Sequence, residues 1–195
     1  MGRMADAAHR LGTLWEQLCA LPRNRIGEIV NGELYSSRRP AGAHARVASG
    51  LGVELGGPFD RGRGGPGGWI ILDEPELHLG DAVLVPDLAG WRRERMPFVD
   101  EGAAAFELSP DWVCEVLSPA TGTLDRVRKM PVYAREQVQF LWLVEPLQRT
   151  LEVFQLQAET WVAVGSYEGD ARVRAVPFDA IELELGNLWA DIRRR

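Results

Sequence analysis

VLVPDLA (residues 83–89) and WVCEVL (112–117) are the two stretches that decide the fold. Each is an apolar, strand-like run interrupted by one acid, Asp87 in the first and Glu115 in the second. Side chains alternate between the two faces of a strand, so each acid shares a face with the apolar residues two positions away. An unpaired carboxylate is costly there, and each acid must meet a cation, a hydrogen-bond donor or a metal ion. One shared partner would satisfy both.

The segments around these stretches predict an α/β (α+β) core made of a helix, a three-stranded meander, a second helix and a further strand. The run FLWLV inside the last segment is continuously apolar, which is typical of a fully buried strand. The predicted elements, in chain order, are the helix 44–55, strands 68–79, 82–91 and 111–117, the helix 123–136 and the strand 139–145.

Further elements are predicted on both sides of this core. Residues 8–21 place leucines at helical spacing and are closed by Pro22, whereas residues 25–36 read as a hairpin around Asn31-Gly32. Residues 56–68, rich in glycine, predict a mobile connector, and two alternating C-terminal strands follow at 150–156 and 160–167. We therefore expect a single domain over 1–195: N-terminal helix and hairpin at 1–40, catalytic core at 43–146 and C-terminal strands at 147–195.

Composition favours a soluble cytoplasmic protein. The chain has 195 residues, is 46% hydrophobic and contains no apolar run long enough for a membrane span or a signal peptide. The cysteines, Cys19 and Cys114, stand far apart without zinc-type spacing, which predicts two buried or inert thiols.

The charge distribution leaves a nucleic-acid partner open. The net charge of -6 argues mildly against strong binding to phosphates, but residues 1–72 carry nine arginines and six acids. This basic half could face a phosphate backbone, or its arginines could be ordinary solvated surface.

Lys129 is the only lysine among 22 basic residues. A buried lysine is a compact donor whose pKa can fall, whereas arginine always keeps its charge, so a site that needs a tunable amine cannot use arginine. In one interpretation, Asp87, Glu115 and the backbone carbonyl of Val116 bind Mg²⁺ or Mn²⁺, and the Lys129 ammonium positions water or neutralises charge at phosphorus. In the other, the acids form structural salt bridges with Lys129 or with the neighbouring arginines.

Several segments together resemble the bacterial family called "putative restriction endonuclease", within the PD-(D/E)XK nuclease superfamily. They are Val85-Pro86-Asp87, the stretch 110–119, Asp125-Arg126 with Lys129 and Tyr133, the strand 140–144 and the hairpin segment 27–34. The resemblance covers roughly residues 14–185. It implies the superfamily's helix, meander, helix and strand, with a divalent metal ion held by Asp87 and Glu115.

The chain departs from the family pattern at one position. The lysine of the Glu-x-Lys element should stand at 117, where this chain has Leu117, so Lys129 in the following helix is the candidate amine. Pro131 predicts that Lys129 ends one short turn rather than lying inside a helix. In a continuous helix, Asp125, Lys129 and Tyr133 would share one face.

Secondary candidates are weaker. By resemblance Glu28 adds another acid to the site, although an exposed strand acid is the commoner interpretation. His44 heads the second helix, where capping is favoured over phosphate contact. Glu76 and His78 line a cleft or simply face solvent, and residues 91–95 supply stacking and phosphate contacts or a solvated strand end.

Three functions follow, in order of preference. The first is a Mg²⁺-dependent endonuclease that hydrolyses phosphodiester bonds of DNA. The second is a catalytically inactive nuclease-fold module that binds nucleic acid. The third is an interaction protein, including a homodimer through the C-terminal strands.

Overall fold

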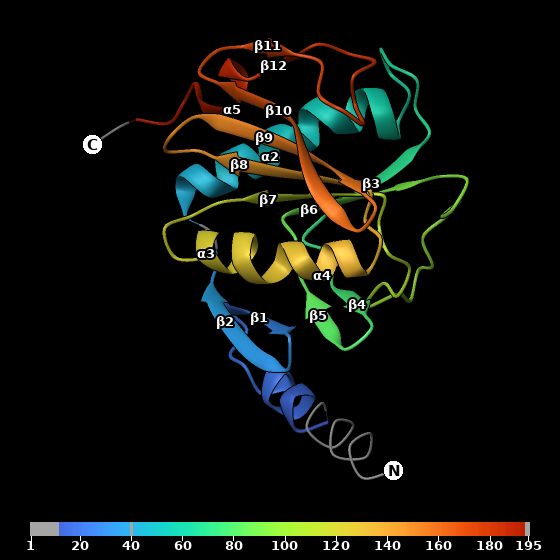
Figure 1. Cartoon of the computed structure of the whole chain (residues 1–195), viewed down its shortest axis with the longest axis vertical. Helices are drawn as coiled ribbons and strands as arrows, with labels where there is room; N and C mark the ends of the chain where they lie inside the picture. The colour runs from blue at the N-terminus through green and yellow to red at the C-terminus, as the bar shows by residue number, and fades with distance from the viewer. Residues whose placement is uncertain (1–11, 40, 194–195) are drawn as a thin grey trace.

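A mixed sheet forms the centre of the molecule (Figure 1). The computed structural model describes residues 12–39 and 41–193, and within them this sheet has six strands in the order β10-β9-β8-β7-β6-β3. β7 and β8 run parallel, and the other neighbouring pairs are antiparallel. The strands are β3 (Trp69–Asp73), β6 (Leu88–Arg92), β7 (Trp112–Val116), β8 (Phe140–Glu145), β9 (Thr150–Gln157) and β10 (Thr160–Glu168).

A second sheet lies on the N-terminal side of the first (Figure 1). In the described part of the chain it has four strands in the order β2-β1-β5-β4, and the short strands β11 and β12 pair separately. The bounds are β1 (Arg25–Val30), β2 (Glu33–Arg38), β4 (Leu77–Leu79), β5 (Ala82–Leu84), β11 (Arg172–Val173) and β12 (Leu183–Glu184). The predicted β1–β2 hairpin is confirmed, with Asn31 and Gly32 at φ 53° and 74° in its turn.

Helices cover the two faces of the central sheet. Their bounds are α2 (Gly42–Leu55), η1 (Gly56–Asp60), α3 (Gly122–Leu124), η2 (Asp125–Lys129), α4 (Met130–Arg135) and α5 (Gly186–Trp189), where η marks a π-helical turn. η1 directly continues α2, so the expectation of a loop beginning at residue 56 was wrong. The first predicted helix is present over 12–19, and its expected start at residue 8 lies outside the described residues.

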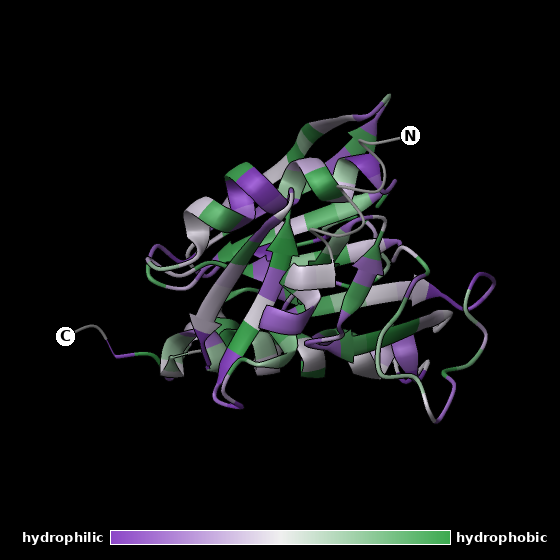
Figure 2. Cartoon of the chain, turned by 90° about the horizontal axis from the view of Figure 1, so that it is seen from below, coloured by the Kyte–Doolittle hydropathy of each residue, from purple (hydrophilic) through white to green (hydrophobic). Residues whose placement is uncertain are grey.

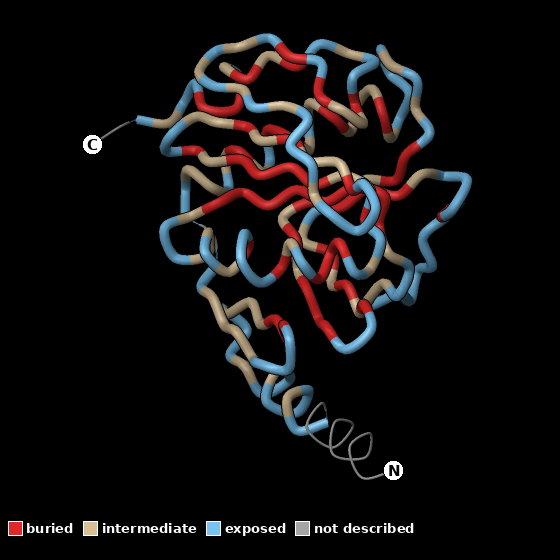
Figure 3. The backbone as a smooth tube through the Cα atoms, in the orientation of Figure 1, coloured by how far each residue is buried: buried red, intermediate tan, exposed pale blue. Residues whose placement is uncertain are grey.

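The sheet is buried on both faces, which creates two apolar clusters. Trp112, Cys114 and Val116 of β7 belong to the cluster that contains α2, and Val113 belongs to the cluster that contains α4. Figure 3 shows β7 and β8 as continuous buried stretches, and Figure 2 shows hydrophobic residues running through the strands in the middle of the molecule. A continuous apolar run is what such a two-sided environment requires.

Two predicted strands are each divided between the two sheets. The expected strand 68–79 is β3 followed by β4, and 82–91 is β5 followed by β6. The break in the first comes at Glu74, whose φ is 44°, and the break in the second comes at Pro86, which has no N–H to donate to a sheet. Both segments therefore change direction at neighbouring positions, where the Glu74 N–H donates to the Asp87 carbonyl at 3.1 Å. The core order of helix, meander, helix and strand is nevertheless confirmed.

Three smaller expectations can be compared with the structure. Cys114 is buried as expected, but Cys19 is exposed. Among the described residues no helix is long and apolar enough to cross a membrane. β10 forms one edge of the sheet with Val162 and Val164 exposed, and a homodimer through the C-terminal strands stays a prediction.

Candidate functional site

Glu28, Asp87, Glu115, Asp125 and Lys129 line one cavity of about 570 Å³ between the two sheets and the helical segment 122–135. They come from β1, the corner before β6, β7 and the π-helical turn η2. β1 is brought to the site by its pairing with β5, where Ile29 lies opposite Val83. The sequence predicted that the two strand acids and the lysine converge, and the structure brings all three together.

Lys129 is at the centre of the charged groups. Its Nζ lies 2.8 Å from Oε1 of Glu28, 2.8 Å from Oε1 of Glu115 and 3.5 Å from Oδ1 of Asp125. A longer contact of 3.5 Å reaches the carbonyl of Val85. The lysine side chain is only 2% exposed, so its charge is balanced by these carboxylates rather than by water.

Glu115 is equally buried, with 3% of its surface exposed. The Tyr133 hydroxyl donates to the same Oε1 that contacts Lys129, at 2.6 Å. Two donors therefore fix the orientation of this carboxylate. The predicted structural salt bridge between a strand acid and Lys129 is present, and it lies inside the cavity that contains the other acids.

Asp87 is held from two sides at the corner between β5 and β6, outside any strand. Its Oδ2 accepts from the Val116 N–H at 2.6 Å, and its Oδ1 lies 3.2 Å from Nε2 of His44. His44 lies in the first turn of α2, near the cap residue Ala41 as expected, but its side chain contacts Asp87 and does not cap the helix. Among the described residues, the buried Nδ1 of His44 has no hydrogen-bond partner.

Glu28 belongs to the site. It is 7% exposed, and its Oε1 accepts from the Val85 N–H at 2.9 Å as well as contacting Lys129. The interpretation of Glu28 as an exposed strand acid was therefore wrong, and the position implied by the family resemblance is the one observed. Just beyond the end of β5, the Glu28 side chain thus accepts the backbone hydrogen bond that a neighbouring strand would otherwise accept.

The helical segment around Lys129 is continuous, contrary to the expected break. The Met130 N–H donates to the Asp125 carbonyl, which widens the helix by one residue at η2. Pro131 then falls in the first turn of α4, where a missing N–H costs little. As a result Lys129 and Tyr133 both contact Glu115, and Asp125 contacts Lys129.

Burial and charge shift the pKa values in the cavity. Burial raises the pKa of Glu115 well above its usual range, against the opposing effect of Lys129, and burial also raises the pKa of Asp125. Burial alone would lower the pKa of Lys129, but the carboxylates of Glu115 and Glu28 outweigh it and raise that pKa well above the ordinary value. These carboxylates therefore favour the ammonium form of Lys129, and a tunable amine at this position stays a prediction.

The pKa of His44 is likewise set by burial and by a neighbouring charge. Burial lowers the pKa of its imidazole, but the hydrogen bond to Asp87 and the charge of that carboxylate raise it to above the usual value. Burial likewise raises the pKa of Tyr133 well above normal, so its hydroxyl stays protonated and acts as a donor to Glu115.

Two secondary candidates lie elsewhere. His78 contacts Glu76 at 2.7 Å and stacks edge-on against Trp15, and neither residue of this pair lines the carboxylate cavity. The segment 91–95 is structural: the Trp91 indole donates to Leu108, and the arginines contact Trp69, Asp60 and Asp111.

The chain matches the Uma2 family, described as "Putative restriction endonuclease", over residues 15–186. The chain belongs to this family. A crystal structure described as a "putative nuclease" from Anabaena variabilis ATCC 29413 is similar in fold, with a TM-score of 0.73 and 24% sequence identity over 91% of this chain and 97% of that chain. No match was found among curated proteins. The mixed α/β architecture of this Uma2 chain is thus that of a nuclease fold, as the sequence resemblance implied.

The donor atoms of this Uma2 chain fit a hard divalent cation. The described residues hold no group of three or more His, Cys, Asp or Glu side chains arranged around one metal position. Mg²⁺, however, commonly uses only one or two carboxylates and completes its shell with water and substrate phosphate. Asp87 and Glu115 supply two such carboxylates to one cavity. Val116, whose carbonyl is the expected backbone ligand, is not among the lining residues of that cavity, and its N–H donates to Asp87.

Proposed function

We propose that this protein is a divalent-metal-dependent endonuclease that hydrolyses phosphodiester bonds of DNA. The observation that supports this most is the cavity itself, where three carboxyl groups contact a single ammonium and a fourth, that of Asp87, lines the same cavity. Among the groups in contact with Lys129 the acids outnumber the cations, and a bound Mg²⁺ or Mn²⁺ would balance them. Membership of the family supports a nucleic-acid substrate, and the choice of DNA rests on the family description alone.

Asp87 and Glu115 are the residues that would hold the cation, with the Val116 carbonyl as a further candidate ligand. When bound, the metal ion supplies Lewis-acid activation of the phosphate and lowers the pKa of attacking water. The chain fixes both carboxylates beforehand: the Val116 N–H and His44 orient Asp87, and Tyr133 orients Glu115. Such prior orientation reduces the reorganisation needed in the transition state.

Lys129 would stabilise charge that develops on the phosphate. An ammonium has three donors, and here two make close contacts with Glu28 and Glu115 while the third has only 3.5 Å neighbours. This weakly engaged donor is available to a non-bridging phosphate oxygen or to the attacking water. The carboxylates that raise the pKa of Lys129 favour its charged form, which would act on the phosphate electrostatically.

Nicking of supercoiled plasmid tests the proposal. We expect cleavage with Mg²⁺ or Mn²⁺ and none in chelator, and we expect Asp87→Asn and Glu115→Gln to lower the rate at least about a hundredfold. Glu76→Gln is the matched control, since Glu76 is an acid of similar chemistry that pairs with His78 outside the cavity. Equal nicking by the wild type and both site variants would refute the assignment, and an RNA substrate of the same sequence tests the choice of DNA.

A nuclease-fold module without catalysis is the second candidate. It is favoured by the absence, within the described residues, of a three-ligand metal group and by the two close contacts that Lys129 already makes with carboxylates. Calorimetric titration with Mn²⁺ separates the two candidates. Heat of binding that disappears in the Asp87→Asn variant supports the nuclease, whereas no binding together with salt-sensitive DNA binding supports the inactive module.

A further inference from the structure

A cationic depression adjoins the carboxylate cavity. It has a volume of about 530 Å³ and is lined by Pro22, Asn24, Arg25, Arg38 and Arg39, so no acid is among its lining residues. The three arginines also line the carboxylate cavity, which makes the two hollows neighbours. The site thus has an acidic floor and a basic rim on the side of the β1–β2 hairpin.

Arg25 and Arg38 lie directly opposite each other in the hairpin register. Like charges at directly opposed positions of an antiparallel pair destabilise it. Arg25 is fixed in place, because its Nε donates to the Ser36 hydroxyl at 2.9 Å and its Nη2 donates to the Ser36 carbonyl at 2.7 Å. Arg25 therefore cannot move away from the position opposite Arg38 without losing both hydrogen bonds.

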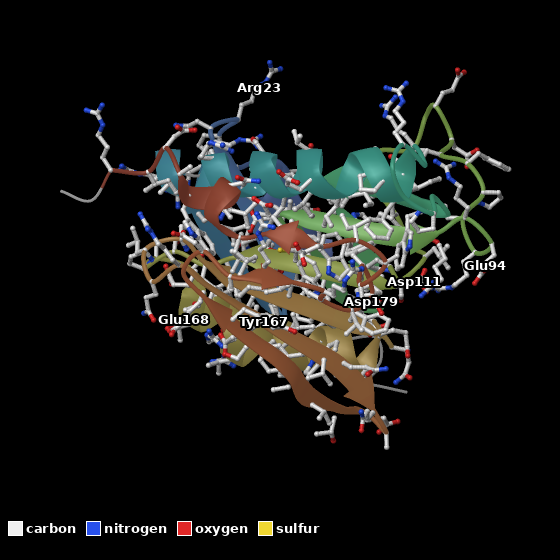
Figure 4. The ribbon with its side chains drawn as sticks, turned by 90° about the horizontal axis from the view of Figure 1, so that it is seen from above. Arg23, Glu94, Asp111, Tyr167, Glu168 and Asp179 are labelled. Carbon is white, nitrogen blue, oxygen red and sulfur yellow. The ribbon has the colours of Figure 1, made fainter. Side chains whose placement is uncertain are left out.

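Carboxylates neutralise this rim only in part. Arg39 pairs with Glu74 at 2.6 Å, whereas the side chain of Arg38 is exposed and makes no hydrogen bond or ion pair with another described residue. Arg23, between the lining residues Pro22 and Asn24, projects away from the body of the molecule (Figure 4). An anion placed between Arg25 and Arg38 would relieve their repulsion and fill the donors that Arg38 leaves unused.

We propose that the guanidinium groups of Arg25 and Arg38 bind a backbone phosphate of the nucleic-acid strand, next to the phosphate that enters the carboxylate cavity. The planar guanidinium fork matches the geometry of phosphate oxygens and can bind them with two parallel hydrogen bonds. This inference rests on the proposed function for the identity of its ligand. It adds a binding surface that the carboxylate cluster and the family description do not assign.

Binding measured without cleavage tests this surface. Fluorescence anisotropy of a short labelled DNA, single-stranded and duplex, is recorded in chelator for the wild type, Arg38→Ala and Arg63→Ala. Arg63 is the control, because it is an exposed arginine outside both cavities and its removal changes the net charge equally. We expect Arg38→Ala to weaken binding about tenfold and to reduce the slope of log affinity against log salt by about one, and Arg63→Ala to change affinity less than about twofold.

Thermal melting adds a readout that a purely structural role would not produce. Removing one of two opposed cations leaves the melting temperature of Arg38→Ala equal to or above that of the wild type, while its DNA binding falls. A lowered melting temperature with unchanged affinity would overturn the proposal, as would equal affinities of the Arg38 and Arg63 variants.

The outcomes separate this inference from the proposed catalysis. Arg38-dependent DNA binding without any nicking supports the phosphate-binding surface and contradicts the nuclease activity. Nicking together with DNA binding that does not depend on Arg38 supports the nuclease activity and contradicts the phosphate-binding surface. Inorganic phosphate that binds the wild type through Arg38, without DNA binding, identifies a small phosphate ligand and overturns the nucleic-acid assignment. A wild type that binds neither probe also overturns it.

Discussion

Replacement of Lys129 by methionine tests the charge balance of the site most directly. Methionine has nearly the length of lysine and no charge, so the substitution removes the ammonium with little change in volume. It leaves Glu28, Glu115 and Asp125 buried, at 7%, 3% and 3% exposure, without the cation that all three contact.

The magnitude follows from this burial. Breaking a buried ion pair by removing one partner costs about 3–5 kcal/mol, because the remaining charge is left uncompensated. For a chain of this size about 1 kcal/mol shifts the melting temperature by roughly 2–4 °C, which gives a loss of roughly 6–20 °C. Arg126→Met is the matched control in the same helical turn, since Arg126 is 41% exposed, pairs with Glu152 on the surface and should cost less than about 1 kcal/mol.

The pH dependence has a definite sign. Without the ammonium, burial and mutual repulsion raise the pKa values of Glu115 and Asp125 further above their unfolded values. A carboxyl group with a raised folded pKa contributes stability below its unfolded pKa and loses it as pH rises through the folded pKa. We therefore expect the stability deficit of Lys129→Met to grow as pH rises from the ordinary carboxyl range, about 4, towards neutrality.

Urea unfolding followed by circular dichroism at several pH values measures this deficit. The double variant Lys129→Met, Glu115→Gln should regain part of the loss, with a coupling energy of about 0.5–3 kcal/mol. A single variant that unfolds within about 1 kcal/mol of the wild type at neutral pH would refute the reasoning. So would a deficit that shrinks as pH rises.

Three further changes have outcomes that the structure defines. Tyr133→Phe removes the hydroxyl that donates to Glu115 and should cost about 1–3 kcal/mol in urea unfolding, so an unchanged midpoint contradicts that contact. A thiol reagent should modify exposed Cys19 in the folded protein and buried Cys114, whose thiol pKa burial raises, only during unfolding. Gly90→Ala places a methyl group 3.1 Å from a tryptophan ring in the core and should cost about 1–3 kcal/mol, which thermal melting measures.

The main elements of the fold could be predicted because their signals are local. A continuous apolar run at 140–144 and the dipeptide Asn31-Gly32 each specify one conformation almost alone. The division of strands between two sheets could not be predicted in the same way. Pro86 signals an interruption, but which sheet each half joins depends on pairing with β1 and β3, which lie far away in the sequence.

The site was predictable where an acid stands alone in an apolar strand, as Glu115 does, and where a residue type occurs once, as Lys129 does. His44 was missed as a partner of Asp87, because a histidine near a helix start has the same local pattern whether it caps the helix or faces a cavity. The effect of Pro131 was also misjudged. A π-helical turn needs the sheet to hold the widened helix in place, and no local sequence rule contains that information.

Stability alone explains neither of the two charged clusters. Replacing a buried ion pair by apolar residues of similar volume is often neutral or stabilising, so stability alone does not explain the three carboxyl groups that contact Lys129. Stability alone does not explain Arg25 opposite Arg38 either, since that pairing is repulsive. The two clusters have opposite signs and line adjoining cavities, which is what a cation and a polyanion bound side by side would require. The two proposed ligands would account for both arrangements with one cause, and the Lys129 and Arg38 variants test the two proposals independently.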